Sequence, residues 1–474
     1  MLFCSKQFLL FYSLVFLVYW MLPWHRARVW LLLFASFYFY ASWNRWLAFL
    51  IGVSTTLDYF LARGMEASDS PRRRRLLVLI SVTANLGLLC YFKYANFFLR
   101  SLEQALHAAG ATASLPVLSV LLPIGISFYT FEAINYTVDI YRRRVAAERS
   151  LPNFMLFILF FPHLVAGPIV RARDFLPQVR RRKNWSWLRF DAGLQLVLMG
   201  VFKKLAIADR MAGFADPVFA DPSAYNTGAL WLGALAYALQ VYCDFSGYTD
   251  IARGAAHLLG YRLAENFNMP YLSANISEFW RRWHISLSTW FRDYLFIPLG
   301  GSRRGRWRTC SNLLITMTLA GLWHGAAWTY VVFGMIQGCW LGLHRLYGGW
   351  RDQRPALRSL LESRPGSALC VAGTFTTFVC TLVVFRGASL VSGFSMIGRM
   401  LTPSSGLSSP LHPAGVAYTV AVMALCHALG WRDNWKKLVG RLPAPVVGVG
   451  YAGVLALALV FAPFAGRAFV YFQF

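Results

Sequence analysis

The chain has 474 residues, of which 57% are hydrophobic, 16% aromatic and only 14% charged. A soluble protein of this length could not cover its surface with so few charges, and recurring apolar runs such as residues 76–92 exclude secreted, disordered, fibrous and coiled-coil proteins. The composition therefore predicts an all-α polytopic membrane protein, built as a helical bundle.

The basic residues are distributed as in a membrane protein. The 46 Lys and Arg against 20 Asp and Glu give a formal net charge of +26, which in a soluble protein would suggest a nucleic-acid partner. Here the arginines gather in short blocks between apolar runs, as the positive-inside rule expects of cytoplasmic loops. We therefore expect contact with membrane lipid and no binding of nucleic acid. The blocks are residues 72–75, 142–144, 180–183, 303–308 and 351–358.

The apolar runs of the first third of the chain give a consistent topology. The run 7–22 has one cation before it, while His25, Arg26 and Arg28 follow directly after it, so we interpret it as a retained span with an external N-terminus, not as a signal peptide. Each later run can cross a bilayer of about 30 Å, with tilt for the shorter ones. The basic loops 63–75 and 141–149 then both lie inside. The expected spans are residues 7–22, 28–42, 45–62, 76–98 and 117–140.

Two segments do not fit simple crossings. Residues 151–170 are apolar but have basic loops on both sides, and prolines and glycines interrupt the helical pattern, which predicts a re-entrant hairpin or an in-plane helix. Residues 270–297 are too polar to span and too aromatic for a free loop. Their apolar side chains, from Trp280 to Phe291, fall roughly on one side of a helix, which predicts an interfacial or re-entrant element on the cytoplasmic side.

The remaining runs bring the expected number of spans to about 11, in a single domain covering residues 1–474. Interrupted helices are also found in transporters, and a transporter is kept as an alternative. The remaining spans are expected as a pair within 313–347 and singly near 369–386, 414–430 and 445–465.

Common catalytic and metal-binding patterns are missing from the sequence. It contains no G-x-S-x-G, no H-E-x-x-H, no phosphate loop and no C-x-x-C, and its eight cysteines are interpreted as small buried hydrophobes. Residues 448–453 match G-x-G-x-x-G by accident, because no strand precedes them and no acidic residue follows. Gly334, Gly338 and Gly342 recur every four residues, which indicates close helix packing rather than a ligand site. We expect no metal and no cofactor.

His324 is the strongest candidate for chemistry. It lies in an apolar run with no acidic or basic residue within ten positions, and ionisable groups at membrane depth commonly line cavities or relay protons. A neutral imidazole can act as a general base towards a hydroxyl. A hydrogen bond to a neighbouring helix is the structural alternative.

Other polar residues have weaker claims to a functional role. His284 is either functional or an interfacial side chain, and His163 is interpreted as structural. Glu132, Asp139 and Asp244 are expected to pair with arginines inside the bundle.

Arginines and tryptophans lie close to His284 in the sequence. They could bind an anionic, partly apolar ligand such as a nucleotide-linked acyl thioester, while anchoring to lipid phosphate is the alternative. These candidate donor-binding residues are Trp280, Arg281, Arg282, Trp283 and Arg292.

The sequence around both histidines resembles the membrane-bound O-acyltransferase family, and within it the bacterial alginate O-acetyltransferase branch. The most specific matches are WRRWHISLS and GLWHG, which contain His284 and His324, and most of the resemblance falls within residues 120–345. Other matching stretches are residues 122–142, 161–171 and 240–254, together with the terminal YFQF at 471–474.

This resemblance implies a bundle around a central tunnel, with His324 as the essential intramembrane histidine and His284 as the second signature position. It implies an enzyme of the bacterial inner membrane that takes an acetyl group from cytoplasmic acetyl-CoA. A separate periplasmic, esterase-like acetyltransferase would then place the acetyl group on a polysaccharide such as alginate, cellulose or peptidoglycan. D-alanyl transfer to teichoic acid is the closest alternative, and a non-catalytic transporter or scaffold is the alternative from another class.

Overall fold

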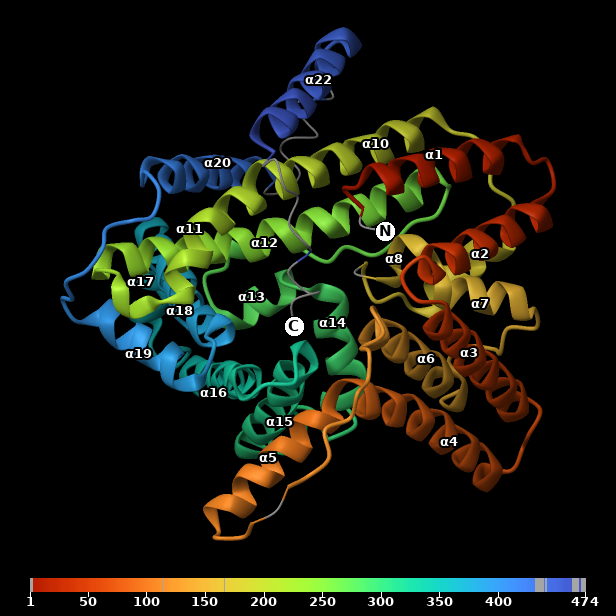
Figure 1. Ribbon diagram of the computed structural model, residues 1–474, viewed down its shortest axis with the longest axis horizontal. Helices are drawn as coiled ribbons and strands as arrows, with labels where there is room; N and C mark the ends of the chain where they lie inside the picture. The colour runs from red at the N-terminus through yellow and green to blue at the C-terminus, as the bar shows by residue number, and fades with distance from the viewer. Residues whose placement is uncertain are drawn as a thin grey trace. The chain divides into compact units, whose positions relative to one another are not determined.

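The computed structural model describes residues 3–112, 114–165, 167–430, 439, 441–462 and 469 (Figure 1). In this part of the chain the regular structure is helical, and β pairing is limited to an isolated bridge between Tyr225 and Leu407. The predicted all-α class is therefore confirmed for the described residues. The terminal YFQF at 471–474 and the last residues of the expected span 445–465 lie outside them.

The helices form two compact units. Unit 1 comprises Met1–Val197 and Thr249–Ala264, and unit 2 comprises Leu198–Tyr248 and Glu265–Phe474. Two long helices, α10 (Trp187–Phe202) and α12 (Thr227–Leu258), contribute residues to both units. The division into compact units does not test whether the chain is a single functional domain, which stays a prediction.

Unit 1 contains the helices of the N-terminal third. Ser5, Asn44 and Ser70 begin three of them, because each side chain accepts a hydrogen bond from a main-chain N–H of the first turn. The helices are α1 (Lys6–Met21), α2 (His25–Ala41), α3 (Arg45–Glu66), α4 (Pro71–Leu89), the π-helical turn η1 (Cys90–Tyr94), α5 (Ala95–Ala108), α6 (Ile126–Tyr141), α7 (Leu151–Leu159), α8 (Phe161–Leu164) and α9 (Ala172–Arg180).

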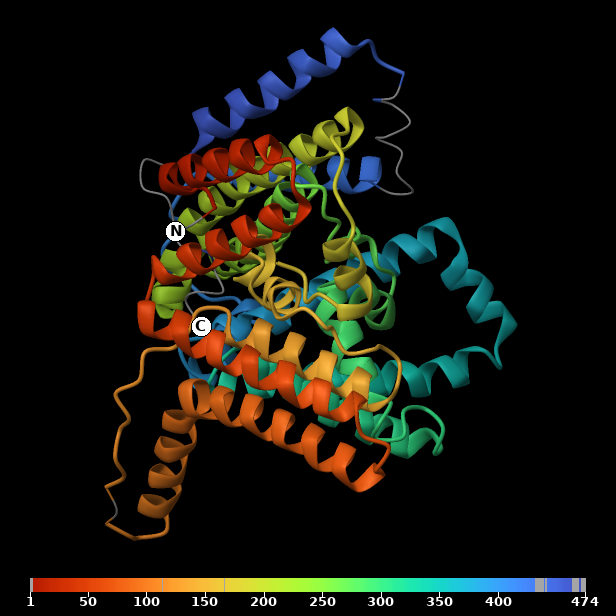
Figure 2. The ribbon, with the colours of Figure 1, turned by 90° about the vertical axis from the view of Figure 1, so that its right-hand side faces the viewer.

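The prediction of a helix over residues 117–140 is wrong for residues 117–125, which are not helical. The chain after α5 is extended and runs back beside that helix, as Figures 1 and 2 show. Asn96 of α5 bonds both main-chain groups of Leu118, at 2.9 and 2.8 Å. Pro123 supplies no N–H, and Gly125 adopts a left-handed φ of 76°, so helix α6 begins only at Ile126.

The interruption of the helical pattern predicted within 151–170 is confirmed, because two short helices form there, while the re-entrant or in-plane position stays a prediction. Helix α7 has nine residues and α8 has four, and both are too short to cross a bilayer. The segment is anchored on α6, where Glu132 Oε1 lies 3.2 Å from His163 Nδ1 and accepts a 2.9 Å hydrogen bond from the main-chain N–H of Val170. The expectation that Glu132 pairs with an arginine is therefore wrong, whereas Asp139 does lie 3.8 Å from Arg144. This contact agrees with the structural interpretation of His163, which stays a prediction.

Unit 2 contains the longer C-terminal helices and several short ones. The elements are η2 (Lys203–Ala208), α11 (Asp209–Ala220), η3 (Pro222–Ala224), η4 (Pro270–Leu272), α13 (Ile276–Arg282), α14 (Ile285–Phe291), η5 (Arg292–Phe296), α15 (Arg306–His324), α16 (Trp328–Arg351), α17 (Pro355–Glu362), α18 (Arg364–Arg386), α19 (Leu390–Leu401), α20 (Ala414–Gly430) and α22 (Ala444–Phe461).

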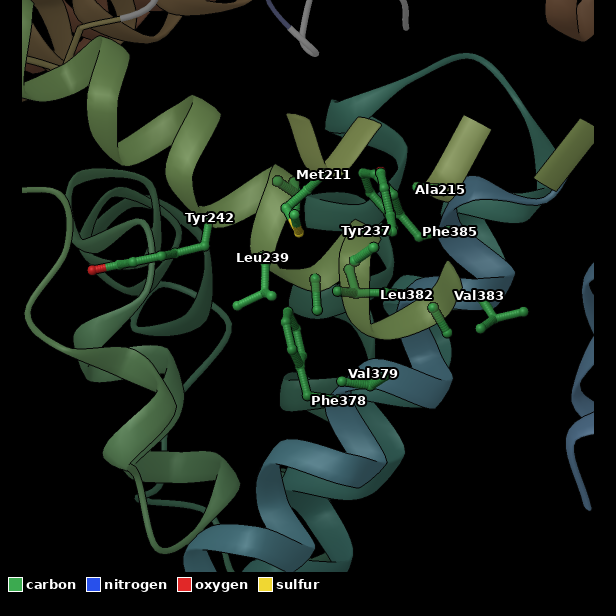
Figure 3. Close-up of a cluster of buried hydrophobic side chains, with 14 of the residues drawn as sticks. Met211, Ala215, Tyr237, Leu239, Tyr242, Phe378, Val379, Leu382, Val383 and Phe385 are labelled. Carbon is green, nitrogen blue, oxygen red and sulfur yellow. The ribbon is translucent and has the colours of Figure 1, made fainter. Parts of the chain in front are cut away.

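The hydrophobic core of unit 2 forms where α18 packs beside α12 and α11. Figure 3 shows Phe378, Leu382 and Phe385 of α18 close to Tyr237 and Leu239 of α12. All five are buried. This core places Phe385 at the ring of His324, which connects it to the candidate site.

By length and composition, three described helical segments could cross a membrane. Several shorter apolar helices accompany them, so the total of about 11 spans stays a prediction. The three segments are Pro71–Ala108, Arg364–Arg386 and Ala444–Phe461, and the shorter ones are Lys6–Met21, Leu151–Leu164, Leu390–Leu401 and Ala414–Gly430.

Candidate active site in unit 2

The helical hairpin of α15 and α16 positions His324. His324 is the last residue of α15, and α16 begins four residues later. Gly334 and Gly338 of α16 pack directly against the backbone of α15, so closely that a Cβ added at Gly338 would lie 2.8 Å from the Cα of Leu314. The packing role predicted for these glycines is confirmed, and the resulting close contact fixes the end of α15 that carries the histidine.

The His324 side chain lies in an aromatic environment. The residue is only 6% exposed, and its ring centroid lies 5.3 Å from that of Phe385 and 5.2 Å from that of Trp323. Both rings stand nearly perpendicular to the imidazole. Aromatic rings therefore enclose the imidazole on these two sides.

His284 lies at the junction between α13 and α14. It is fully buried and has a left-handed backbone conformation, with φ 43° and ψ 54°. Its ring is perpendicular to that of Phe245 at a centroid distance of 4.6 Å and lies 5.6 Å from that of Trp323. The interfacial alternative for this side chain is therefore wrong, because His284 is inside the unit.

Trp323 links the two histidines. Its ring centroid lies 5.6 Å from that of His284 and 5.2 Å from that of His324. The structure thus brings together two residues that are 40 positions apart in the sequence. Their individual roles in the reaction stay predictions. Trp323 itself was missed, although its position beside His324 in GLWHG was a usable signal.

The left-handed residue at 284 corrects one expectation about residues 270–297. The apolar residues from Trp280 to Phe291 do not share one face of a continuous helix, because the chain changes direction at His284. The segment is divided into short helices, since α13 and α14 have seven residues each, and its interfacial or re-entrant position on the cytoplasmic side stays a prediction.

The five candidate donor-binding residues occupy different environments. Trp283 is buried in the hydrophobic core, and the Trp280 indole N–H donates to Gln337 Oε1 at 3.2 Å, so both rings support the fold around His284. Arg282 is held by Glu278 at 2.9 Å and by the main-chain oxygen of Asn268 at 3.1 Å.

Arg281 and Arg292 are exposed, and Arg292 lies 2.8 Å from Asp293. Of the predicted set, these two arginines are therefore the ones whose charges face outward and could meet an anionic donor.

A buried ionic cluster is a further feature of unit 2 that the sequence did not reveal. Lys204 Nζ lies 2.8 Å from a carboxylate oxygen of Asp209 and 2.8 Å from one of Asp244. All three side chains are at most 6% exposed. The cation that lies beside Asp244 is a lysine supplied by the π-helical turn η2, where the sequence led us to expect an arginine.

Comparison with known proteins places this geometry in context. Residues 2–383 match the family described as MBOAT, membrane-bound O-acyltransferase family. The chain is 39% identical to the probable alginate O-acetylase AlgI of Pseudomonas putida, over 100% of both chains. It is 35% identical to the peptidoglycan O-acetyltransferase of Helicobacter pylori, over 79% of this chain and 73% of the relative. It is 30% identical to the teichoic acid D-alanyltransferase of Streptococcus thermophilus, over 57% of this chain and 69% of the relative.

Proposed function

Because the chain belongs to the membrane-bound O-acyltransferase family and is an O-acyltransferase, we propose that it moves an acetyl group from cytoplasmic acetyl-CoA across the bacterial inner membrane for O-acetylation of an extracytoplasmic polysaccharide. The observation that carries the proposal is the meeting of His284 and His324 at Trp323, inside unit 2. The two motifs with the most specific resemblance thereby contribute to one buried site.

The relatives support acetyl as the transferred group. Two that cover most of this chain are named as acetylating enzymes, one for alginate and one for peptidoglycan. The D-alanyltransferase is less similar and matches only 57% of the chain, so D-alanyl transfer is less well supported. Since both acetylating relatives are named for polysaccharides, we take a polysaccharide as the final acceptor.

In the proposed reaction His324 acts as the general base. It accepts the proton of an incoming hydroxyl, whose oxygen attacks the carbonyl carbon of the thioester and forms the new ester bond. The C–S bond breaks, the sulfur leaves with the bonding electrons, and the proton passes from His324 to this thiolate. General-base catalysis of this kind contributes about 10²- to 10⁴-fold to the rate.

His284 has a supporting role in this proposal. It positions the thioester or maintains the geometry of the site beside His324, while Arg281 and Arg292 attract the anionic part of the donor from the cytoplasmic side. We propose a periplasmic, esterase-like acetyltransferase as the partner that receives the exported acetyl group. The acceptor hydroxyl that His324 activates then belongs to that partner or to the polymer.

The experiment that tests the proposal measures release of free CoA by purified protein in proteoliposomes. Labelled acetyl-CoA is supplied on the donor side, with polysaccharide and with or without a periplasmic extract. We expect CoA release and transfer of the label, both lost in His324→Ala while membrane insertion is normal. Release of no CoA under any of these conditions would contradict acetyl transfer, and activity only with a D-alanyl thioester would replace acetyl by D-alanyl.

A further inference from the structure

The backbone at His284 is held in a conformation that is unfavourable for a residue with a Cβ. Its left-handed φ of 43° and ψ of 54° terminate α13 and start α14 in a new direction, as Figure 1 shows. Such conformations persist only where surrounding contacts determine them, and they are concentrated at functional sites. The contacts that determine this one come from residues 266–268, a segment of unit 2 about twenty positions earlier in the sequence.

Main-chain hydrogen bonds from this segment hold the chain on both sides of His284. The N–H of Asn268 donates to the carbonyl oxygen of Arg282 at 2.9 Å, and the N–H of Ile285 donates to the carbonyl oxygen of Asn266 at 2.9 Å. Arg282, two positions before His284, and Ile285, directly after it, are therefore both hydrogen-bonded to residues 266–268.

The Asn266 side chain supplies the missing cap of α14. His284 occupies the N-cap position of this helix but makes no side-chain capping bond, although an N-cap side chain usually accepts from the first turn. Instead, Asn266 Oδ1 accepts from the main-chain N–H of Ser286 at 3.1 Å and from the Ser286 hydroxyl at 2.7 Å. Because a main-chain N–H can only donate, the amide oxygen of Asn266 must face Ser286.

This arrangement leaves the imidazole of His284 for another task. Had the histidine capped its own helix, its ring would have been directed at the first turn of α14 instead of lying between Phe245 and Trp323. Phe267, next to Asn266, reinforces the position, because its ring lies 5.1 Å from that of Phe245.

Asn266 also has a feature that stability alone does not explain. The residue is fully buried, and its Nδ2 has no hydrogen-bond partner among the residues that the structure describes. A buried donor without a partner is unfavourable, so an asparagine here is a poor choice for simple packing. Its useful atom is Oδ1, which sets the start of α14 and with it the conformation of His284.

From these contacts we infer that Asn266 is a positioning residue for His284: it caps α14 in place of the histidine and thereby directs the imidazole towards Trp323 and His324. Asn266 does not touch the reacting atoms in this account. The inference rests on the proposed function, since His284 matters only if the site transfers an acyl group.

The first test is a double-mutant cycle on the rate of CoA release. Asn266→Ala removes the cap, and a displacement of about 1 Å in a catalytic site can lower the rate about 100-fold, so we expect a fall of this order in kcat with the KM for acetyl-CoA within threefold of wild type. In a His284→Gln background the same substitution should lower the rate less than threefold, because the residue through which it acts is already altered.

Asn268→Ala is the matched control, since its exposed side chain is not used in the main-chain bonds described above. It should retain wild-type kcat. Equal effects of Asn266→Ala with and without His284 would show a general structural role and overturn the inference, as would near-wild-type activity of Asn266→Ala. An inactive wild-type protein would instead refute the proposed function.

A second measurement is independent of activity. Hydrogen exchange of a peptide that contains Ser286 should be at least tenfold faster in Asn266→Ala than in wild type, while the exchange of α15 is unchanged. Unchanged exchange at Ser286 would show that Asn266 does not hold the start of α14 and would overturn the inference even in a protein with no measurable turnover.

Discussion

Substitution of Lys204 by methionine tests whether the buried ionic cluster of unit 2 stabilises the protein. The Nζ atom lies 2.8 Å from both Asp209 and Asp244, and none of the three side chains is more than 6% exposed. Methionine has a similar length but no charge. Lys204→Met therefore removes the cation that lies between two buried carboxylates.

The size of the effect follows from the number of pairs and their burial. Removing one partner of a buried ion pair costs about 3–5 kcal/mol, because the remaining charge loses its partner without regaining water. We expect a loss within this range rather than twice as much, since the two carboxylates share one cation and either can become neutral by taking up a proton.

Thermal unfolding in detergent, followed by tryptophan fluorescence, measures the loss. Arg63→Met is the control, because Arg63 and Glu66 form a 3.4 Å pair with side chains 41% and 37% exposed, and such pairs contribute at most about 1 kcal/mol. Adding Asp209→Asn and Asp244→Asn to Lys204→Met should recover most of the lost stability. A Lys204→Met protein no less stable than Arg63→Met would refute the reasoning.

Two further predictions concern the packing of the α15–α16 hairpin and the topology. Gly338→Ala places a Cβ against α15 and should lower the rate of CoA release about 100-fold through displacement of His324. Gly348→Ala on the same helix is the control, because its Cβ meets nothing within 4 Å and should leave the rate unchanged. Equal rates of the two variants would contradict the packing argument. Cysteines placed at Arg143 and Arg173 should both be blocked by a cytoplasmic thiol reagent, and labelling from opposite sides would show that residues 151–170 span.

The features that could be predicted from the sequence are those with a local signal. The four-residue repeat of Gly334, Gly338 and Gly342 indicated a close helix contact, and the structure places the first two against the backbone of α15. The prolines and glycines of residues 151–170 likewise indicated an interrupted element. His324 was singled out because an ionisable residue inside an apolar run is rare.

The features that could not be predicted depend on contacts between distant segments. The left-handed conformation of His284 is determined by Asn266 and its neighbours. Helical periodicity alone therefore predicts, wrongly, that the apolar residues on both sides of His284 share one face of a single helix. A partner of Asp244 is Lys204, which lies forty positions away on a π-helical turn. The extended chain before α6 depends on Asn96, whose side chain bonds the main chain of Leu118.

The most direct test of the central claim compares the initial rates of CoA release by wild type, His324→Gln and His284→Gln. Glutamine retains hydrogen bonding but has no titratable ring. We expect His324→Gln to lose about 10²- to 10⁴-fold, as removal of a general base requires, while His284→Gln keeps measurable activity. Equal inactivity of both folded variants, with donor binding intact, would show that His284 also takes part in the chemistry. A His324→Gln rate within twofold of wild type would contradict the account.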